Sequence, residues 1–156
     1  MIRILVLAGL LLVLGGCTDS ESPEQQVRDV LTAMQTAVES GSVIEASELL
    51  DPGYRDLHHP NKRAAARSLF AYTRRHRNIH LFVRIQSVDV AAHERSAEAV
   101  LQVAMTAEPA DSTEHLLALK ADLYRFEVQL VWNRDEEAWR IASSTWRRAN
   151  LASLVK

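Results

Sequence analysis

The sequence predicts an α+β fold in which N-terminal helices pack on a strongly curved, four-stranded antiparallel sheet. Apolar residues recur at helical spacing in the first half of the chain and alternate with polar residues through most of the second half. Helices followed by strands favour a layer of helices on one face of an antiparallel sheet. The expected strands are about ten residues or longer and would reach ~33 Å if flat, so the sheet should bend strongly.

The first predicted helix begins at Pro23. Ser22 suits the N-cap, Pro23 the first helical position, and Gln25 completes a capping box three residues after the cap. An apolar stripe follows at spacings of three and four, made by Val27, Val30, Leu31, Met34 and Val38. Gly41 is expected to end this helix.

Two further helices are predicted. Ser42 and Glu45 form a second capping box, and Asp51-Pro52-Gly53 ends that short helix. Asn61 can cap a third helix over about 62–75. Its apolar side is expected to hold Ala65, Ala66, Leu69, Phe70 and Thr73, and the other side Arg63, Arg67, Arg74 and Arg75. Arg77 extends this arginine cluster. The cluster indicates either a patch for lipid headgroups, an anionic glycan or an acidic partner, or a solvated surface.

Alternation predicts the strands. The segment from Ile79 to Val90 shifts parity after Ile85, which indicates a bulge. Ser96 to Ala107 alternates without interruption, whereas 108–120 is irregular, with a turn of helix or an early strand at its end.

The last hairpin is the most regular stretch. Its first strand has one apolar parity, made by Tyr124, Phe126, Val128, Leu130 and Trp132. On the second strand the same face is expected to hold Trp139, Ile141, Ser143 and Thr145, so it changes from apolar to hydroxylic. That change indicates a bend, or a pocket with a polar end. The turn lacks Asn-Gly and Asp-Gly, so a loop of several residues is expected.

The N-terminus has the pattern of a secretion signal. Arg3 is the only charge before residue 19, and an apolar run is followed by Leu14-Gly15-Gly16-Cys17. This ending resembles the lipobox of bacterial lipoproteins, in which cleavage after Gly16 would leave a lipidated Cys17. An ordinary signal peptide with an incidental cysteine is the alternative. Several acyl chains would anchor the chain stably to a lipid bilayer.

The resemblance also implies a location. Residue 18 is Thr rather than Asp, and in Gram-negative lipoproteins Asp at that position retains the protein at the inner membrane. The expectation is therefore a lipid-anchored protein of the cell envelope, at the outer membrane and facing the periplasm if the source is Gram-negative. The implied division is a signal peptide over 1–16, a lipidated tether over 17–21, a domain over 22–148 and a tail over 149–156.

Composition excludes several classes of function. The chain has one cysteine, so it forms no intrachain disulfide, and its formal net charge of −2 gives no argument for nucleic acid. The adjacent His58 and His59 would point opposite ways on extended backbone, and no set of ligands has the spacing of a zinc site. No metal and no cofactor are predicted.

The order of elements over 22–148 resembles the nuclear transport factor 2-like superfamily, which includes ketosteroid isomerase and SnoaL-like proteins. The final hairpin, with Trp139-Arg140-Ile141 after a charged turn, is the strongest local match, although the usual glycine of that turn is missing. The resemblance implies a cystatin-like cone with a pocket at its open end. The candidates for lining that pocket are Tyr54, Asp122, Tyr124, Phe126, Val128, Trp139 and Ser143.

No residue falls in a transferable catalytic motif, so the leading hypothesis is a non-enzymatic module that binds a small apolar ligand or a partner protein of the envelope. The alternative is a small isomerase or dehydratase, with Asp122, or Asp56 with His58, as the base near Tyr54 or Tyr124. A third hypothesis is a homodimer formed through the outer sheet face.

Overall fold

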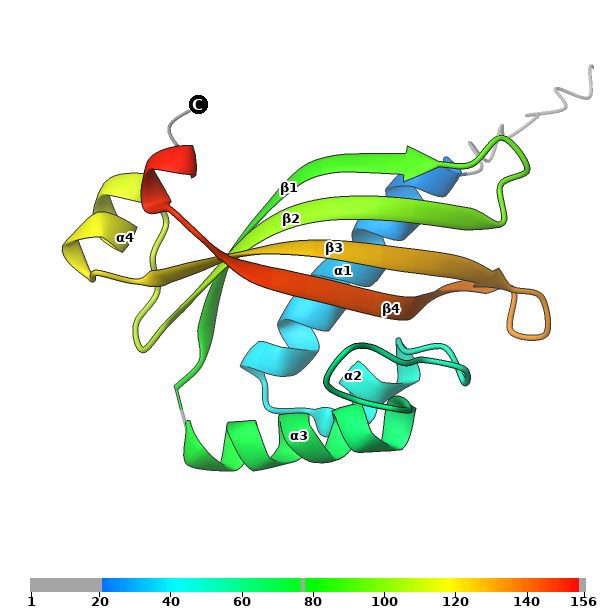
Figure 1. Cartoon of the computed structure of the whole chain (residues 1–156), viewed down its shortest axis with the longest axis horizontal. Coiled ribbons are helices and arrows are strands. Elements are labelled where there is room, and N and C mark those ends of the chain that lie inside the picture. Colours follow the sequence, from blue (N-terminus) through cyan, green and yellow to red (C-terminus); the bar gives the residue numbers. More distant parts are fainter. Residues whose placement is uncertain (1–20, 77, 155–156) are drawn as a thin grey trace, which may run out of the picture.

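The computed structural model describes residues 21–76 and 78–154. The predicted signal peptide, Cys17 and most of the tether lie outside these residues. Within them, no helix is both long and apolar enough to cross a membrane. The elements are, in chain order (Figure 1), α1 Pro23–Glu39, α2 Val43–Glu48, α3 Lys62–Arg75, β1 His80–Val90, β2 Ser96–Thr106, α4 Thr113–Ala118, β3 Asp122–Asn133, β4 Ala138–Ala149 and the 3₁₀ helix η1 Leu151–Leu154.

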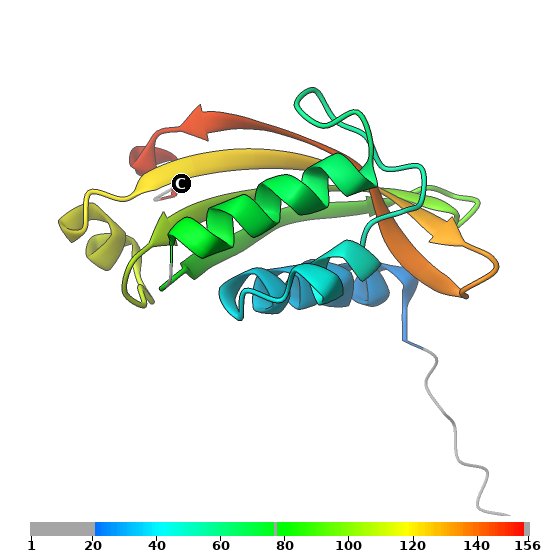
Figure 2. The same cartoon turned by 90° about the horizontal axis from the view of Figure 1, so that it is seen from below.

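The predicted α+β class and curled sheet are confirmed. In the described part of the chain, the strands form one antiparallel sheet with the order β1-β2-β3-β4. The sheet curves around α1, α2 and α3, which lie on its concave side (Figure 2). Because side chains alternate along a strand, every second residue of each strand points to the opposite, convex side.

Helix α1 begins and ends as its sequence predicts. The Ser22 hydroxyl accepts a hydrogen bond from the backbone N–H of Gln25 at 3.2 Å. At the other end Gly41 has a φ of 73°, and the N–H of Ser42 donates to the carbonyl of Ala37 at 2.9 Å. This is a Schellman motif, in which the left-handed residue is usually glycine.

Helix α3 differs from its prediction at one residue, Phe70. Asn61 caps it, because its side chain accepts from the N–H of Ala64 at 2.9 Å, but none of the residues of α3 is buried. Phe70, expected on the apolar side, is 51% exposed, and the guanidinium of Arg74 lies over its ring. Tyr72 faces the sheet instead, and its hydroxyl donates to Sδ of Met105 at 3.2 Å. Ala65 packs against the core, and Ala66, Leu69 and Thr73 are half-buried while the four arginines are exposed. The spacing therefore located the helix and its inner side, with Phe70 as the exception.

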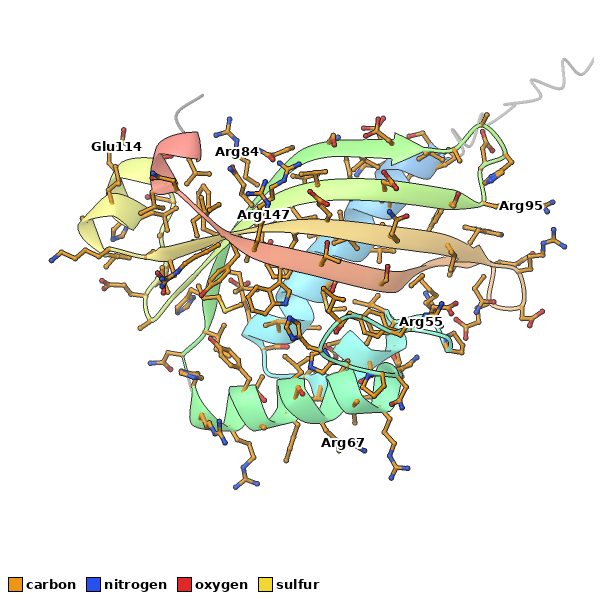
Figure 3. The ribbon with its side chains drawn as sticks, viewed as in Figure 1. Arg55, Arg67, Arg84, Arg95, Glu114 and Arg147 are labelled. Atoms are coloured by element: carbon orange, nitrogen blue, oxygen red, sulfur yellow. The ribbon has the colours of Figure 1, made fainter. Side chains whose placement is uncertain are left out.

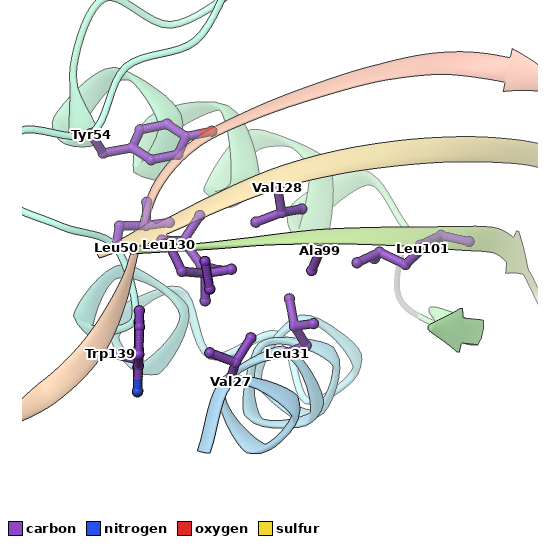
Figure 4. Close-up of a cluster of buried hydrophobic side chains, with 12 residues drawn as sticks. Val27, Leu31, Leu50, Tyr54, Ala99, Leu101, Val128, Leu130 and Trp139 are labelled. Carbon is purple, nitrogen blue, oxygen red and sulfur yellow. The ribbon is translucent and has the colours of Figure 1, made fainter. Parts of the chain in front are cut away.

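The main hydrophobic core lies between α1 and the concave face of the sheet (Figure 4). Val27 and Leu31 of α1 pack in one cluster with Ala99, Leu101 and other concave-face residues of β2 and β3. Trp139 of β4 is 2% exposed, and its indole N–H donates to Oε1 of Gln26 at 3.2 Å. This bond satisfies the polar end of a buried indole and ties the last strand to the first helix.

A second cluster lies on the convex side, at the end of the sheet far from the start of α1. There α4 and η1 lie together (Figure 1), and Leu116 and Leu154 pack with Ala104 and Leu123 of the sheet. Leu154 is 3% exposed, and the guanidinium of Arg84 donates to its carbonyl. The C-terminal segment therefore docks on the sheet up to residue 154.

Two bulges set which side chains face inward. The bulge predicted after Ile85 is present, since the pairing of β1 with β2 shifts between Ile85 and Ser87. A second shift occurs in β4, where Leu130 pairs with Ile141 but Gln129 pairs with Ser143, so Ala142 is the extra residue.

The second bulge overturns one prediction. Beyond Ala142 the concave face of β4 holds Ser144, Trp146 and Arg148, which pair with Val128, Phe126 and Tyr124. Ser143 and Thr145 pair with Gln129 and Glu127 and lie on the convex face. The hydroxyl at the polar end of the concave face therefore belongs to Ser144.

Candidate functional site

A buried phenol joins the loop after α2 to strand β4. Tyr54 is 5% exposed, because the loop runs along the edge of β4, with the N–H of Asp51 bonded to the carbonyl of Ile141 at 2.8 Å. Its hydroxyl donates to Oδ2 of Asp56 at 2.6 Å and lies 3.0 Å from Oγ of Ser144. Tyr54 and Asp56 thus lie within hydrogen-bond reach, as the enzyme hypothesis expected.

Asp56 organises the tip of the same loop. Its Oδ1 accepts the backbone N–H groups of His58 and His59, each at 2.7 Å. The ring Nδ1 of His59 lies 2.9 Å from Oδ2, and the Asp56 side chain is 7% exposed. The carboxylate therefore fixes the loop and the orientation of the His59 ring. The sequence hypothesis paired Asp56 with His58. The structure instead places the ring of His59 on Asp56, and His58 bonds to this carboxylate through its backbone N–H.

The pKa values of this pair move apart. Burial raises the pKa of Asp56, but hydrogen bonds from Tyr54, from the His59 ring and from two backbone N–H groups outweigh burial and lower it to about 2. Burial and the hydrogen bond to Asp56 raise the pKa of Tyr54 to about 12. At neutral pH the phenol is a donor and the carboxylate an acceptor, and a carboxylate this acidic is a weak general base.

Asp122 occupies a different environment. It begins β3, its side chain is 56% exposed, and it forms an ion pair with Arg148. An exposed, ion-paired carboxylate lacks the apolar cavity that the enzyme hypothesis requires of a base.

Strand β4 also brings aromatic side chains together. We define the concave aromatic patch as His58, Tyr72, Met105, Tyr124, Phe126 and Trp146. Trp146 lies at its centre, with ring centroids 5.2 Å from His58, 5.6 Å from Tyr124 and 6.5 Å from Phe126. Tyr72 reaches across from α3 to Met105, and side chains fill the space between α3 and the sheet (Figure 3). Arg67 points away from the sheet on the far side of α3.

The patch is not fully covered by the fold. Trp146 is 48% exposed and Met105 37% exposed, although both lie on the concave face. Tyr124 and Phe126 are half-buried. Of the remaining pocket candidates, Val128 and Trp139 are core residues, and Ser143 lies on the convex face. Sequence reasoning missed Trp146, because the bulge at Ala142 reverses the parity expected of it.

Other hollows lie beside the helices. One of about 470 Å³ is lined by Pro52 and the start of α3. Another of about 560 Å³ lies between α1, α2 and Arg140. Neither is lined by a residue of the concave aromatic patch. In residues 21–76 and 78–154, no three His, Cys, Asp or Glu side chains group as a metal site requires.

The comparisons with known proteins concern the fold. No family model and no curated protein matches the chain. An uncharacterised Caulobacter vibrioides protein with a cystatin-like fold has a TM-score of 0.65 at 14% identity, over 84% of this chain and 92% of that one. A candidate dehydratase of the nuclear transport factor 2-like family from Streptomyces avermitilis has a TM-score of 0.60 at 16% identity, over 81% and 96%.

A third neighbour is longer. Bd1075 of Bdellovibrio bacteriovorus has a TM-score of 0.60 at 12% identity and covers 81% of this chain, but this chain spans only 40% of its length. At these identities the neighbours bear on the fold alone.

Proposed function

We propose, on the premise that the chain has the nuclear transport factor 2-like fold of these neighbours, that it is a lipid-anchored binding protein of the cell envelope. Its ligand is a small apolar molecule held on the concave aromatic patch. The observation that carries this proposal is Trp146, an indole 48% exposed at the centre of an aromatic cluster. Aromatic side chains bury a large apolar area when a ligand covers them, and this burial favours binding. The Trp146 indole is only partly covered by the rest of the fold, so it has such area to offer.

The polar residues beside the patch suit binding better than proton transfer. Tyr54, Asp56 and Ser144 satisfy one another's hydrogen bonds, which makes the loop rigid. A rigid loop holds His58 against Trp146 before any ligand arrives, and such preorganisation lowers the entropic cost of binding.

Extraction of bound molecules tests the ligand. We expect the native chain, purified from its own cells and extracted with organic solvent, to release an apolar compound detectable by mass spectrometry. The Trp146→Ala variant should release much less, while Trp132→Ala, which changes an indole outside the patch, should retain it. If the native chain releases no compound and position 146 crosslinks to an envelope protein, the patch binds a partner protein rather than a small ligand.

The anchor is tested separately. The motif Leu14-Gly15-Gly16-Cys17 supports lipidation at Cys17. We expect Cys17→Ala to remain unprocessed or to be mislocalised in membrane fractionation, and normal fractionation of that variant would refute the anchor.

One contact favours a second candidate, a proton-transfer enzyme. The Asp56 carboxylate lies 2.9 Å from Nδ1 of His59, and a carboxylate in this position orients the imidazole ring of a histidine. Under this candidate His59→Gln would abolish an isomerase or dehydratase activity while ligand binding persists. Binding lost together with activity would assign His59 to the structure of the loop.

A further inference from the structure

We infer that the ligand of the concave aromatic patch is a small organic acid, with an apolar ring system and one carboxylate bound by Arg148. This inference rests on the proposed function and names the chemical class of its ligand. The residue that supports this inference is Arg148, which lies at one end of the patch.

Arg148 lies on the same face as the patch. It pairs with Tyr124 across the ladder and follows Trp146 by two residues, so its backbone lies about 7 Å further along the strand. A fused ring on Trp146 that carries a carboxylate at its edge spans that distance. The side chain of Arg148 is 69% exposed and is reachable from solvent.

The partner of Arg148 leaves room for a second anion. Its Nη2 donates to Oδ1 of Asp122, and the Tyr124 hydroxyl also interacts with the guanidinium. A guanidinium has five N–H donors in a planar fork that matches a carboxylate. Both members of the pair are more than half exposed, so the ion pair is weak and a ligand carboxylate can compete with Asp122.

Charges around this end of the patch favour an anion over a cation. Arg75 lies in the last turn of α3, three residues after Tyr72, and is exposed, whereas the guanidinium of Arg74 lies over Phe70. Asp122 is the acid in direct contact with Arg148, and a local excess of basic groups attracts anionic ligands.

Three probes of similar shape and different charge test which ligand charge the patch prefers. The full chain in lipid nanodiscs is titrated by equilibrium dialysis with 2-naphthoate, neutral 2-naphthamide and cationic 2-naphthylmethylammonium, with empty nanodiscs as the blank. We expect 2-naphthoate to bind about fivefold more tightly than 2-naphthamide, because solvent weakens an exposed charge contact. Arg148→Gln should abolish that preference and leave 2-naphthamide binding unchanged.

Two variants complete the design. Asp122→Asn should tighten 2-naphthoate binding about twofold, because it removes the competing carboxylate from Arg148. Arg147→Gln, the adjacent arginine on the opposite face, is the matched control and should change nothing.

Equal binding of all three probes, or a preference for the cation, overturns the assignment of an acid while the patch remains a binding surface. A preference for 2-naphthoate that survives Arg148→Gln overturns the role of Arg148. Binding of none of the probes counts against both the acid and the proposed patch.

Discussion

The hydroxyl of Tyr54 donates a 2.6 Å hydrogen bond to Oδ2 of Asp56, two residues further along the chain. Ser144 on β4 lies 3.0 Å from the same hydroxyl, so one phenol connects the loop to the sheet. Because this loop presents His58 to Trp146, the Tyr54–Asp56 bond supports the concave aromatic patch from behind.

Removing the phenol oxygen should loosen this connection. We expect Tyr54→Phe to lower the free energy of unfolding by about 1–3 kcal/mol, since Asp56 and Ser144 both lose a partner in a largely buried place. Urea unfolding measures the change. Ser144→Ala removes one of the two contacts and should cost less, and a Tyr54→Phe variant as stable as the parent would contradict this role.

Acid should weaken the fold through Asp56. The pKa of this carboxyl is lowered from 3.8 to about 2 in the folded chain. The stabilisation is therefore complete above about pH 4 and is lost as the pH falls towards 2, in total on the order of 2 kcal/mol. Unfolding free energies measured between pH 6 and pH 2 should fall more steeply for the parent than for Asp56→Asn. Parallel pH profiles would rule out this contribution.

The last turn should gain stability from a glycine. Glu137 has a φ of 48° in the turn between β3 and β4, a left-handed conformation that costs a residue with a side chain about 1–2 kcal/mol. We expect Glu137→Gly to stabilise the chain by about 0.5–1 kcal/mol. The gain is smaller than the strain that is removed, because glycine also raises the conformational entropy of the unfolded chain. Thermal unfolding tests this. Gly41→Ala, at a φ of 73° with nothing within 4 Å of the added Cβ, should have the opposite sign.

The docked C-terminal segment should contribute to the fold. Leu154 is 3% exposed against Leu116 and Leu123, so Leu154→Ala should cost about 2 kcal/mol in unfolding free energy. Leu117 on α4 is 51% exposed, and Leu117→Ala should change the free energy by no more than about 0.5 kcal/mol. Equal effects of the two substitutions would mean that η1 does not dock in solution.

The elements that the sequence predicted well are those with local signals. Ser22, Ser42 and Asn61 cap the predicted helices, because a capping hydroxyl or amide acts within three residues of its partner. Alternation located the strands, because the side chains of a strand reverse at every residue. The short helix α4 also has a local cap, since the Ser112 hydroxyl accepts from the N–H of His115, but its segment was left open between a helical turn and a strand. The docking of η1 depends on contacts far apart in the chain.

The site was harder to predict, because tertiary contacts decide it. At the bulge, the N–H of Arg55 in the loop after α2 bonds to the carbonyl of Ala142 at 3.3 Å, a contact between residues far apart in the chain. No pattern within β4 announces that extra residue. One inserted residue moves every later side chain to the other face, which is why Ser143 was expected at the concave face and Trp146 was not.

The tryptophan indole N–H signals of the ¹⁵N-labelled chain in lipid nanodiscs test most directly whether the concave aromatic patch binds a ligand. The chain has three tryptophans, and only Trp146 lies in the patch, while the Trp139 indole is bonded to Gln26. Titration with neutral 2-naphthamide should move the Trp146 signal saturably and leave the signals of Trp132 and Trp139 in place. In the Tyr54→Phe variant, whose loop no longer holds His58 firmly, the same titration should have no effect on the Trp146 signal. A Trp146 signal that stays fixed at saturating probe, or that moves together with the other two, would contradict the proposed binding surface.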